Sequence, residues 1–179
     1  MTKSKLLEKF LEWMVYIRNK TWSPFFANLE KWRYSSLFKQ GAKIRAILKI
    51  HTVKQLVEYL HAYDFQWEND PLYGAYDYES YPEITLATRR GDCDDFARLG
   101  IDLLKHSYQK VWKVYCYNGS IYEGHVMVLF YNKNGWKLLS NTNAYDLGKN
   151  LDNPGQTAAE CFFGDQLFVY AVEKIKDFE

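Results

Sequence analysis

The stretch that decides the fold is Gly91-Asp92-Cys93-Asp94-Asp95-Phe96-Ala97, which continues as RLGIDLL to residue 104. Asp92 is a favourable N-cap, because its side chain can accept hydrogen bonds from the unpaired backbone N–H groups at a helix start. Asp94 and Asp95 suit the first turn, where the helix dipole favours negative charge. Apolar residues then recur on two faces, so we expect a central helix that begins at Cys93.

Helices are also predicted before this stretch. Apolar residues at i, i+3 and i+4 spacing predict an amphipathic helix over residues 4–18, and a second helix is predicted over 24–39, with Gly41 breaking it. Thr52, followed three residues later by Gln55, has the form of a capping box and predicts the start of a third helix. We therefore expect the first part of the chain to be mainly helical.

A long irregular loop is predicted over residues 63–90, which hold Asp, Asn, Pro, Gly and many aromatic residues. Such a loop in a compact domain is often functional. Its aromatic side chains, among them Tyr73 and Tyr76, indicate that it packs rather than remaining disordered.

The hydrophobic period changes after the Cys93 helix, and strands are predicted. Asn132-Lys133-Asn134-Gly135 is a hairpin turn, because Asn-Gly readily takes positive φ. Helices that precede antiparallel strands predict the α+β class. The predicted strands are 111–117, 124–131, 136–140 and 166–172.

The charge of the chain is unevenly distributed. The net charge is +1, but residues 1–50 contain eleven Lys and Arg against three Glu, which leaves the remainder acidic. We predict a basic helical N-terminal extension over 1–50, packed on a core domain over 51–179. Because no nucleic-acid motif accompanies the charge, nucleic-acid binding through residues 1–50 is the less favoured alternative.

Three cysteines, Cys93, Cys116 and Cys161, are widely spaced and form no CxxC pair, so no metal or other cofactor is expected. Charged residues interrupt the apolar run that a signal peptide needs, and no stretch approaches transmembrane length. We therefore expect a cytoplasmic protein with free thiols and no membrane partner.

A cysteine is a useful nucleophile only as a thiolate, which a helix N-terminus and a nearby imidazole both stabilise. The acidic neighbours of Cys93 raise its pKa, so a histidine partner is needed. His106 lies about 20 Å further along the same helix and cannot be that partner. His51 and His61 lie near helix ends, whereas His125 begins a predicted strand at a sheet edge. We expect Cys93 to be the nucleophile and His125 its base.

A third side chain should orient the imidazole. In one register of the predicted hairpin His125 faces Asn141; in a second register it faces Asn143, with Asn141 diagonal. Either way both asparagines share the face of His125, because side chains alternate along a strand. The asparagine oxygen can accept the Nδ1 proton. Asn141 is the expected third residue, with Asn143 and Asp146 as alternatives.

These residues resemble the motifs of a known family, the transglutaminase-like superfamily, over about residues 52–145. The segment that precedes Cys93 is similar to bacterial transglutaminase-like cysteine peptidases in particular. The matching stretches are Gly91–Ala97 for the nucleophile motif, Gly124–Val128 for the histidine motif, Trp136–Asn141 for the third-residue strand, and Tyr76–Glu83 leading to Arg90–Cys93.

The resemblance implies a papain-like α+β fold, with the cysteine helix packed on an antiparallel sheet that carries the histidine and the third residue. It implies a thiol-dependent amide hydrolase or acyl transferase, a cysteine peptidase-like enzyme with a catalytic triad that acts on a protein or peptide. The family's third residue is usually Asp, and its place here falls at Ser140–Asn141. That departure, with the acids around Cys93, leaves a second possibility: a binding module that keeps the fold and has lost turnover.

Overall fold

The computed structural model of the chain describes residues 3–69, 78–118, 124–164, 166 and 168–177. Helices come first and an antiparallel sheet follows, so the expected α+β class is confirmed. Tyr73 and Tyr76 of the predicted aromatic loop lie outside the described residues.

Five strands form the main sheet in the order β6-β5-β4-β3-β7, and each neighbouring pair is antiparallel. Side chains alternate along β4 and enter two separate cores: Val126 and Val128 face one side, and Met127 and Leu129 face the other. The strands are β3 (Lys110–Tyr117), β4 (Gly124–Asn132), β5 (Gly135–Ser140), β6 (Asn143–Gly148) and β7 (Val169–Asp177).

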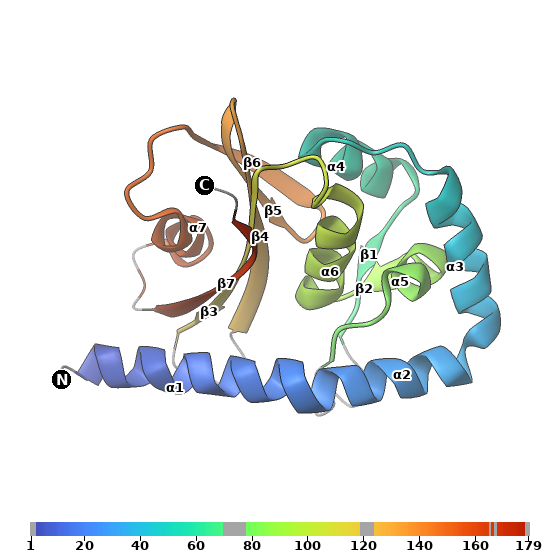
Figure 1. Cartoon of the computed structure of the whole chain (residues 1–179), viewed down its shortest axis with the longest axis horizontal. Coiled ribbons are helices and arrows are strands. Elements are labelled where there is room, and N and C mark those ends of the chain that lie inside the picture. Colours follow the sequence, from blue (N-terminus) through green and yellow to red (C-terminus); the bar gives the residue numbers. More distant parts are fainter. Residues whose placement is uncertain (1–2, 70–77, 119–123, 165, 167, 178–179) are drawn as a thin grey trace.

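Helices cover both faces of this sheet, as Figure 1 shows. Helix α6 (Cys93–Leu104) and helix α4 (Val53–Ala62) supply the core on the face of Val128, through residues such as Leu56 and Leu99. Helix α7 (Pro154–Phe163) covers the opposite face, where Phe163 packs with Leu129. The cysteine helix therefore packs on an antiparallel sheet, as the family resemblance implied.

The N-terminal helices form a rod along one side of the molecule (Figure 1). Helix α1 (Lys3–Ile17) passes through a π-helix, η1 (Arg18–Trp22), into α2 (Ser23–Arg33). Asn19 fixes the rod to the sheet by donating to Tyr115 Oη (2.8 Å) and Glu173 Oε2 (2.9 Å). We call residues 3–33 the N-terminal rod.

The helix break expected at Gly41 was wrong. Helix α3 (Ser35–Ile47) continues through Gly41 and packs against α5 (Pro82–Thr88). A Cβ at position 41 would lie 1.6 Å from the backbone oxygen of Glu83. The glycine therefore allows two helix backbones to approach closely, a tertiary requirement that local propensity does not reveal.

The predicted cap at Thr52 is confirmed, whereas the predicted loop and the list of strands were incomplete. Thr52 caps α4 as expected, since its hydroxyl accepts from the Gln55 N–H (3.2 Å). The stretch 63–90 contains α5 and a short parallel pair, β1 (Gln66–Trp67) and β2 (Arg90–Gly91), so it is more regular than predicted. Strand β6 and helix α7 were not predicted, and the last strand begins later than expected.

The close approach at Gly41 predicts that Gly41→Ala destabilises the fold. The methyl group meets backbone and can be accommodated only if α3 and α5 separate, so we expect the free energy of unfolding to fall by about 2–3 kcal/mol. Urea titration followed by circular dichroism measures this. Exposed Gln40, the preceding residue, provides the control Gln40→Ala. Equal stability of the two variants would contradict the packing argument.

Candidate active site

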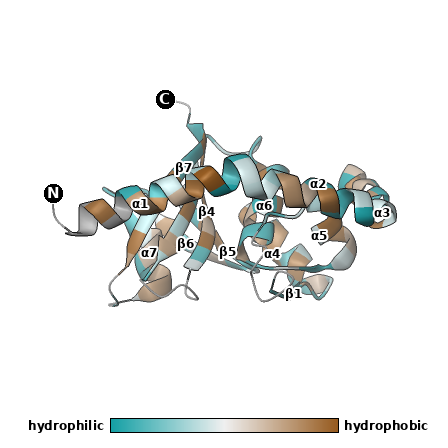
Figure 2. Ribbon diagram, turned by 90° about the horizontal axis from the view of Figure 1, so that it is seen from below, coloured by the Kyte–Doolittle hydropathy of each residue, from teal (hydrophilic) through white to brown (hydrophobic). Residues whose placement is uncertain are grey.

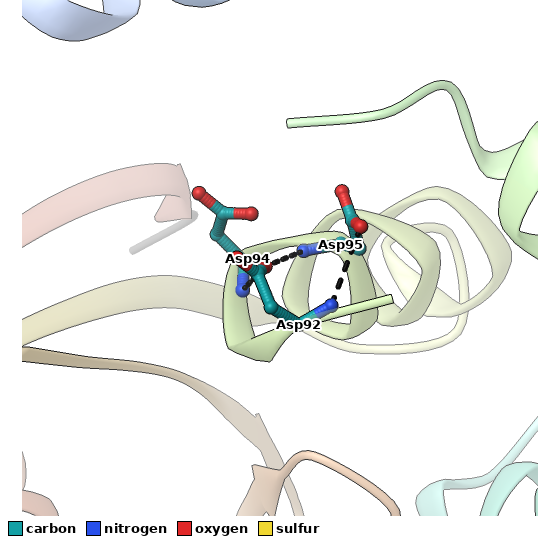
Figure 3. Close-up of side chains that lie close together, drawn as sticks. All are labelled: Asp92, Asp94 and Asp95. Atoms are coloured by element: carbon teal, nitrogen blue, oxygen red, sulfur yellow. Dashed lines mark hydrogen bonds between the residues drawn. The ribbon is translucent and has the colours of Figure 1, made fainter. Parts of the chain in front are cut away.

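A complete capping box fixes the start of α6. Asp92 accepts hydrogen bonds from the backbone N–H groups of Asp94 (3.1 Å) and Asp95 (3.4 Å), and Asp95 Oδ2 accepts from the Asp92 N–H (3.3 Å) (Figure 3). Cys93 is therefore the first residue of the helix, as predicted. Its half-buried thiol packs against the core between α6 and the sheet.

Residues that are distant in the sequence pair with the buried acids beside Cys93. Asp94, whose side chain is 2% exposed, forms an ion pair with Arg18 of η1. Asp95 Oδ1 accepts a hydrogen bond from the Ser80 backbone N–H (2.6 Å). Because the Arg18 guanidinium offsets the carboxylate next to Cys93, the acidic surroundings oppose a thiolate less than the sequence suggested.

A second buried ion pair adjoins this one. Arg18 Nη1 lies 3.5 Å from Glu79 Oε1, and Glu79 also pairs with Lys113 of β3. Burial alone would raise the pKa of Glu79, but the nearby Lys113 and Arg18 charges outweigh it and lower the pKa. Burial lowers the pKa of Lys113, with Glu79 acting in the opposite sense. No local sequence signal indicates this pair, because its members are 34 positions apart.

His125 lies at the start of β4 with 5% of its surface exposed. Its ring stacks on Phe162 of α7, with centroids 4.0 Å apart and an interplanar angle of 18°. Nε2 lies 2.8 Å from Ser140 Oγ, within hydrogen-bond distance. Burial lowers the pKa of His125 to about 4, so the ring is neutral at pH 7.

Cys93 lies on α6 and His125 on the neighbouring strand β4, but their side chains are on opposite faces of the sheet. His125 pairs across the strands with Cys116, and helix α6, which begins at Cys93, packs against β4, the strand that carries His125. However, the His125 ring packs against α7, whereas Cys93 belongs to α6 and packs on the other face. Their catalytic pairing stays a prediction.

The hairpin register differs from both expected ones. Val128 pairs with Leu139 and Asn132 with Gly135, which is one residue away from either alternative. The expectation that Asn141 and Asn143 share the face of His125 was therefore wrong. Ser140, which sequence reasoning did not choose, lies on that face. The signal that could have identified it is the two-residue length of the turn.

The other candidate third residues lie elsewhere. Asn141 occupies the turn between β5 and β6 with φ 51°, and its Oδ1 is buried. Asn143 begins β6 and is exposed. Asp146 is exposed and forms an ion pair with Lys137. Among the described residues, the hydrogen bond recorded for the His125 ring is the one to Ser140.

Asp94 and the two acids of the capping box, Asp92 and Asp95, also form a group of oxygen ligands that could hold a cation. One oxygen each from Asp92, Asp94 and Asp95 lies within 4.8 Å of the others. All three already have protein partners, in the helix N–H groups, Arg18 and Ser80. Arg18 thus supplies positive charge at the point where a cation would bind.

The Arg18–Asp94 pair predicts that Arg18→Gln destabilises the protein. It leaves a buried carboxylate without its cation, so we expect a loss of about 3 kcal/mol in the free energy of unfolding. Asp94→Asn in the same chain should restore part of the loss, because a neutral amide needs no counter-charge. Lys20→Gln, at an exposed site in η1, is the control. If Arg18→Gln proves as stable as this control, the pair has no structural role.

The lowered pKa of His125 predicts a pH dependence of stability. Above about pH 6.5 the ring is neutral in both states; as the pH falls towards 4, the unfolded chain binds a proton that the folded chain does not. Stability conferred by the neutral ring is therefore present above pH 6.5 and lost on acidification. Between pH 7.5 and 4.5 we expect a loss of about 2–3 kcal/mol that is absent in His125→Gln.

Urea titrations at several pH values measure this difference, and His61→Gln, at an exposed histidine, is the control. Parallel pH profiles for wild type and His125→Gln would show that His125 is not the buried neutral group described here.

Comparisons with known proteins give a limited result. No protein-family model matches the chain, and no curated protein matches it in sequence. Structures of LapG from Legionella pneumophila are similar. The calcium-bound form has 24% identity over 63% of this chain and 67% of LapG, with a TM-score of 0.43. The EGTA-treated form has 22% identity over 63% and 66%, with a TM-score of 0.43. At these TM-scores the likeness assigns the chain to no family.

Proposed function

We propose that the chain is a thiol-dependent amide hydrolase or acyl transferase of the cysteine-peptidase kind, with Cys93 as nucleophile and a protein or peptide as substrate. One observation carries this proposal: a half-buried thiol occupies the first position of a capped helix, and this helix packs against β4, the strand that carries His125. Helix N-termini stabilise thiolates. Arg18 limits the opposing effect of Asp94.

The chemistry follows from these positions. Cys93 Sγ attacks an amide carbonyl carbon, and its proton passes to His125. The Cys93 backbone N–H, at the helix start, donates to the oxyanion. His125 then protonates the leaving amine. Water hydrolyses the thioester and restores the thiol; an amine in place of water would give a cross-link.

This mechanism requires a movement of His125. Proton transfer needs a nitrogen within about 3 Å of the sulfur, directly or through one water. The Phe162 stack and the Ser140 contact hold the ring on the α7 face. His125 therefore has to leave Phe162 before the step, and its pKa would rise as it leaves this buried position.

A second candidate function is a binding module without turnover. The position of His125 favours it, because a buried ring with a pKa of about 4 is a weak base at neutral pH. The hydroxyl within hydrogen-bond distance of the His125 ring is that of Ser140, which has no charge to stabilise an imidazolium.

Thiol labelling tests the nucleophile. Burial raises the pKa of Cys116 to about 12, and Cys161, although exposed, also has a raised pKa through partial burial and the charge of Glu160. With limiting iodoacetamide at neutral pH we expect Cys93 to be alkylated first, as read by mass spectrometry of peptides. Cys93→Ala should remove this labelling, and Cys161→Ala should leave it unchanged. Faster labelling of Cys161 or Cys116 would contradict the proposal.

Digestion of a peptide library separates the two candidate functions. If the chain is an enzyme, Cys93→Ala abolishes cleavage, and His125→Ala lowers its rate by about 10²–10⁴-fold, the usual contribution of a general base. Cys161→Ala is the matched control. Fast Cys93 alkylation without cleavage or amine incorporation would favour the binding module.

A further inference from the structure

The outer side of the N-terminal rod is apolar along most of its length. Six large side chains on it are between 49% and 79% exposed, far more than such residues usually are. We call them the outer stripe: Phe10, Trp13, Trp22, Phe25, Leu29 and Trp32. Figure 2, which views the molecule from below, shows α1 and α2 crossing its front with hydrophobic turns along them.

The inner side of the rod carries the contacts with the rest of the protein. Asn19 donates hydrogen bonds to residues of the sheet, and Ala27 is buried. Ser23 Oγ accepts a hydrogen bond from the Glu79 N–H (2.9 Å), and the Glu30 carboxylate accepts one from Ser80 Oγ (3.0 Å). These residues recur at helical spacing and account for the inward face. The outer stripe is therefore not needed to attach the rod.

The π-helix brings the two halves of the stripe together. Trp22, Phe25, Leu29 and Trp32 recur at spacings of three, four and three. Trp13 and Trp22 are nine residues apart, which in an unbroken α-helix is about two and a half turns and would place them on opposite sides. A π-helical turn contains more residues than an α-turn, so η1 reduces this rotation and turns the second half towards the first.

Exposed cations accompany the stripe. Lys9, Lys20 and Arg33 are exposed along the rod, and Glu12 is the exposed acid between them. Glu30, the next acid, is engaged with Ser80. A partner surface that covers the stripe would thus meet apolar side chains with predominantly positive charge beside them.

We propose that the outer stripe binds the surface of a membrane that contains anionic lipids. An amphipathic helix with Trp, Phe and Leu on one side and Lys and Arg beside them lies flat at the boundary between headgroups and acyl chains. Tryptophan is enriched at this boundary, and each nearby cation adds attraction to anionic lipid. A second copy packed on the same stripe would bring two basic rods together, so charge opposes that occupant.

No membrane partner was expected from the sequence because no spanning segment was found. Among the described residues, no helix is long and apolar enough to cross a bilayer. A helix that lies in the interface does not need to cross it. The rod runs along one side of the molecule, with the sheet and α6 on the other side of it (Figure 1), so it can rest on a surface without displacing the fold.

Vesicle sedimentation of the full chain tests this proposal. We expect binding to phosphatidylcholine vesicles that contain about 30% phosphatidylserine and much weaker binding to phosphatidylcholine alone. The double variant Trp22→Ser/Phe25→Ser should weaken binding about tenfold or more, since both side chains are lost from the interface. Lys9→Glu/Lys20→Glu should weaken binding to the anionic vesicles only.

The control Ile47→Ser/Trp67→Ser removes exposed apolar side chains from other parts of the surface and should bind like wild type. Thermal melts confirm that all variants fold. Absence of sedimentation, or equal sedimentation of wild type and Trp22→Ser/Phe25→Ser, would overturn the proposal. Light scattering that shows a dimer abolished by the stripe variant would also overturn it, by assigning the stripe to a second copy.

Discussion

Three aspartates at the start of α6 depend on partners from separate parts of the chain. Asp92 accepts from its own helix, Asp94 pairs with Arg18 of the rod, and Asp95 accepts from Ser80. A buried carboxylate is tolerated only when it is paired and hydrogen-bonded. The rod, the segment around residue 80 and α6 must therefore assemble together, and the position of Cys93 follows from that assembly.

The same constraint influences the thiol. Negative charge beside Cys93 opposes ionisation, and the helix N-terminus and Arg18 act in the opposite sense. His125 is controlled by different elements, since Phe162 of α7 stacks on it and Ser140 of β5 contacts Nε2. Cys93 and His125 are thus held by separate layers of the fold, and the proposed catalysis would require a change on the α7 side.

The N-terminal rod has two distinct sides that meet in η1. This five-residue π-helix directs Arg18 inwards to Asp94 and Glu79 and leaves Trp22 outwards in the outer stripe. A π-helical turn within an α-helix is often associated with a functional position. Within this one turn, η1 therefore carries both a residue of the surface proposed to bind lipid, Trp22, and the cation beside the acids at Cys93, Arg18.

Local sequence determined the start of α6, the cap at Thr52, the strands β3 to β5 and the α+β class, because caps, turns and hydrophobic period depend on neighbouring residues. Tertiary structure decided the rest. Gly41 serves a close approach to Glu83 that no neighbour of Gly41 reveals. The contact of His125 with Ser140 rather than Asn141 depended on the β4–β5 register, in which a shift of one residue changes which β5 side chains share the face of His125. The ion pairs of Arg18 and Lys113 join residues far apart in sequence, and only packing brings such charges together.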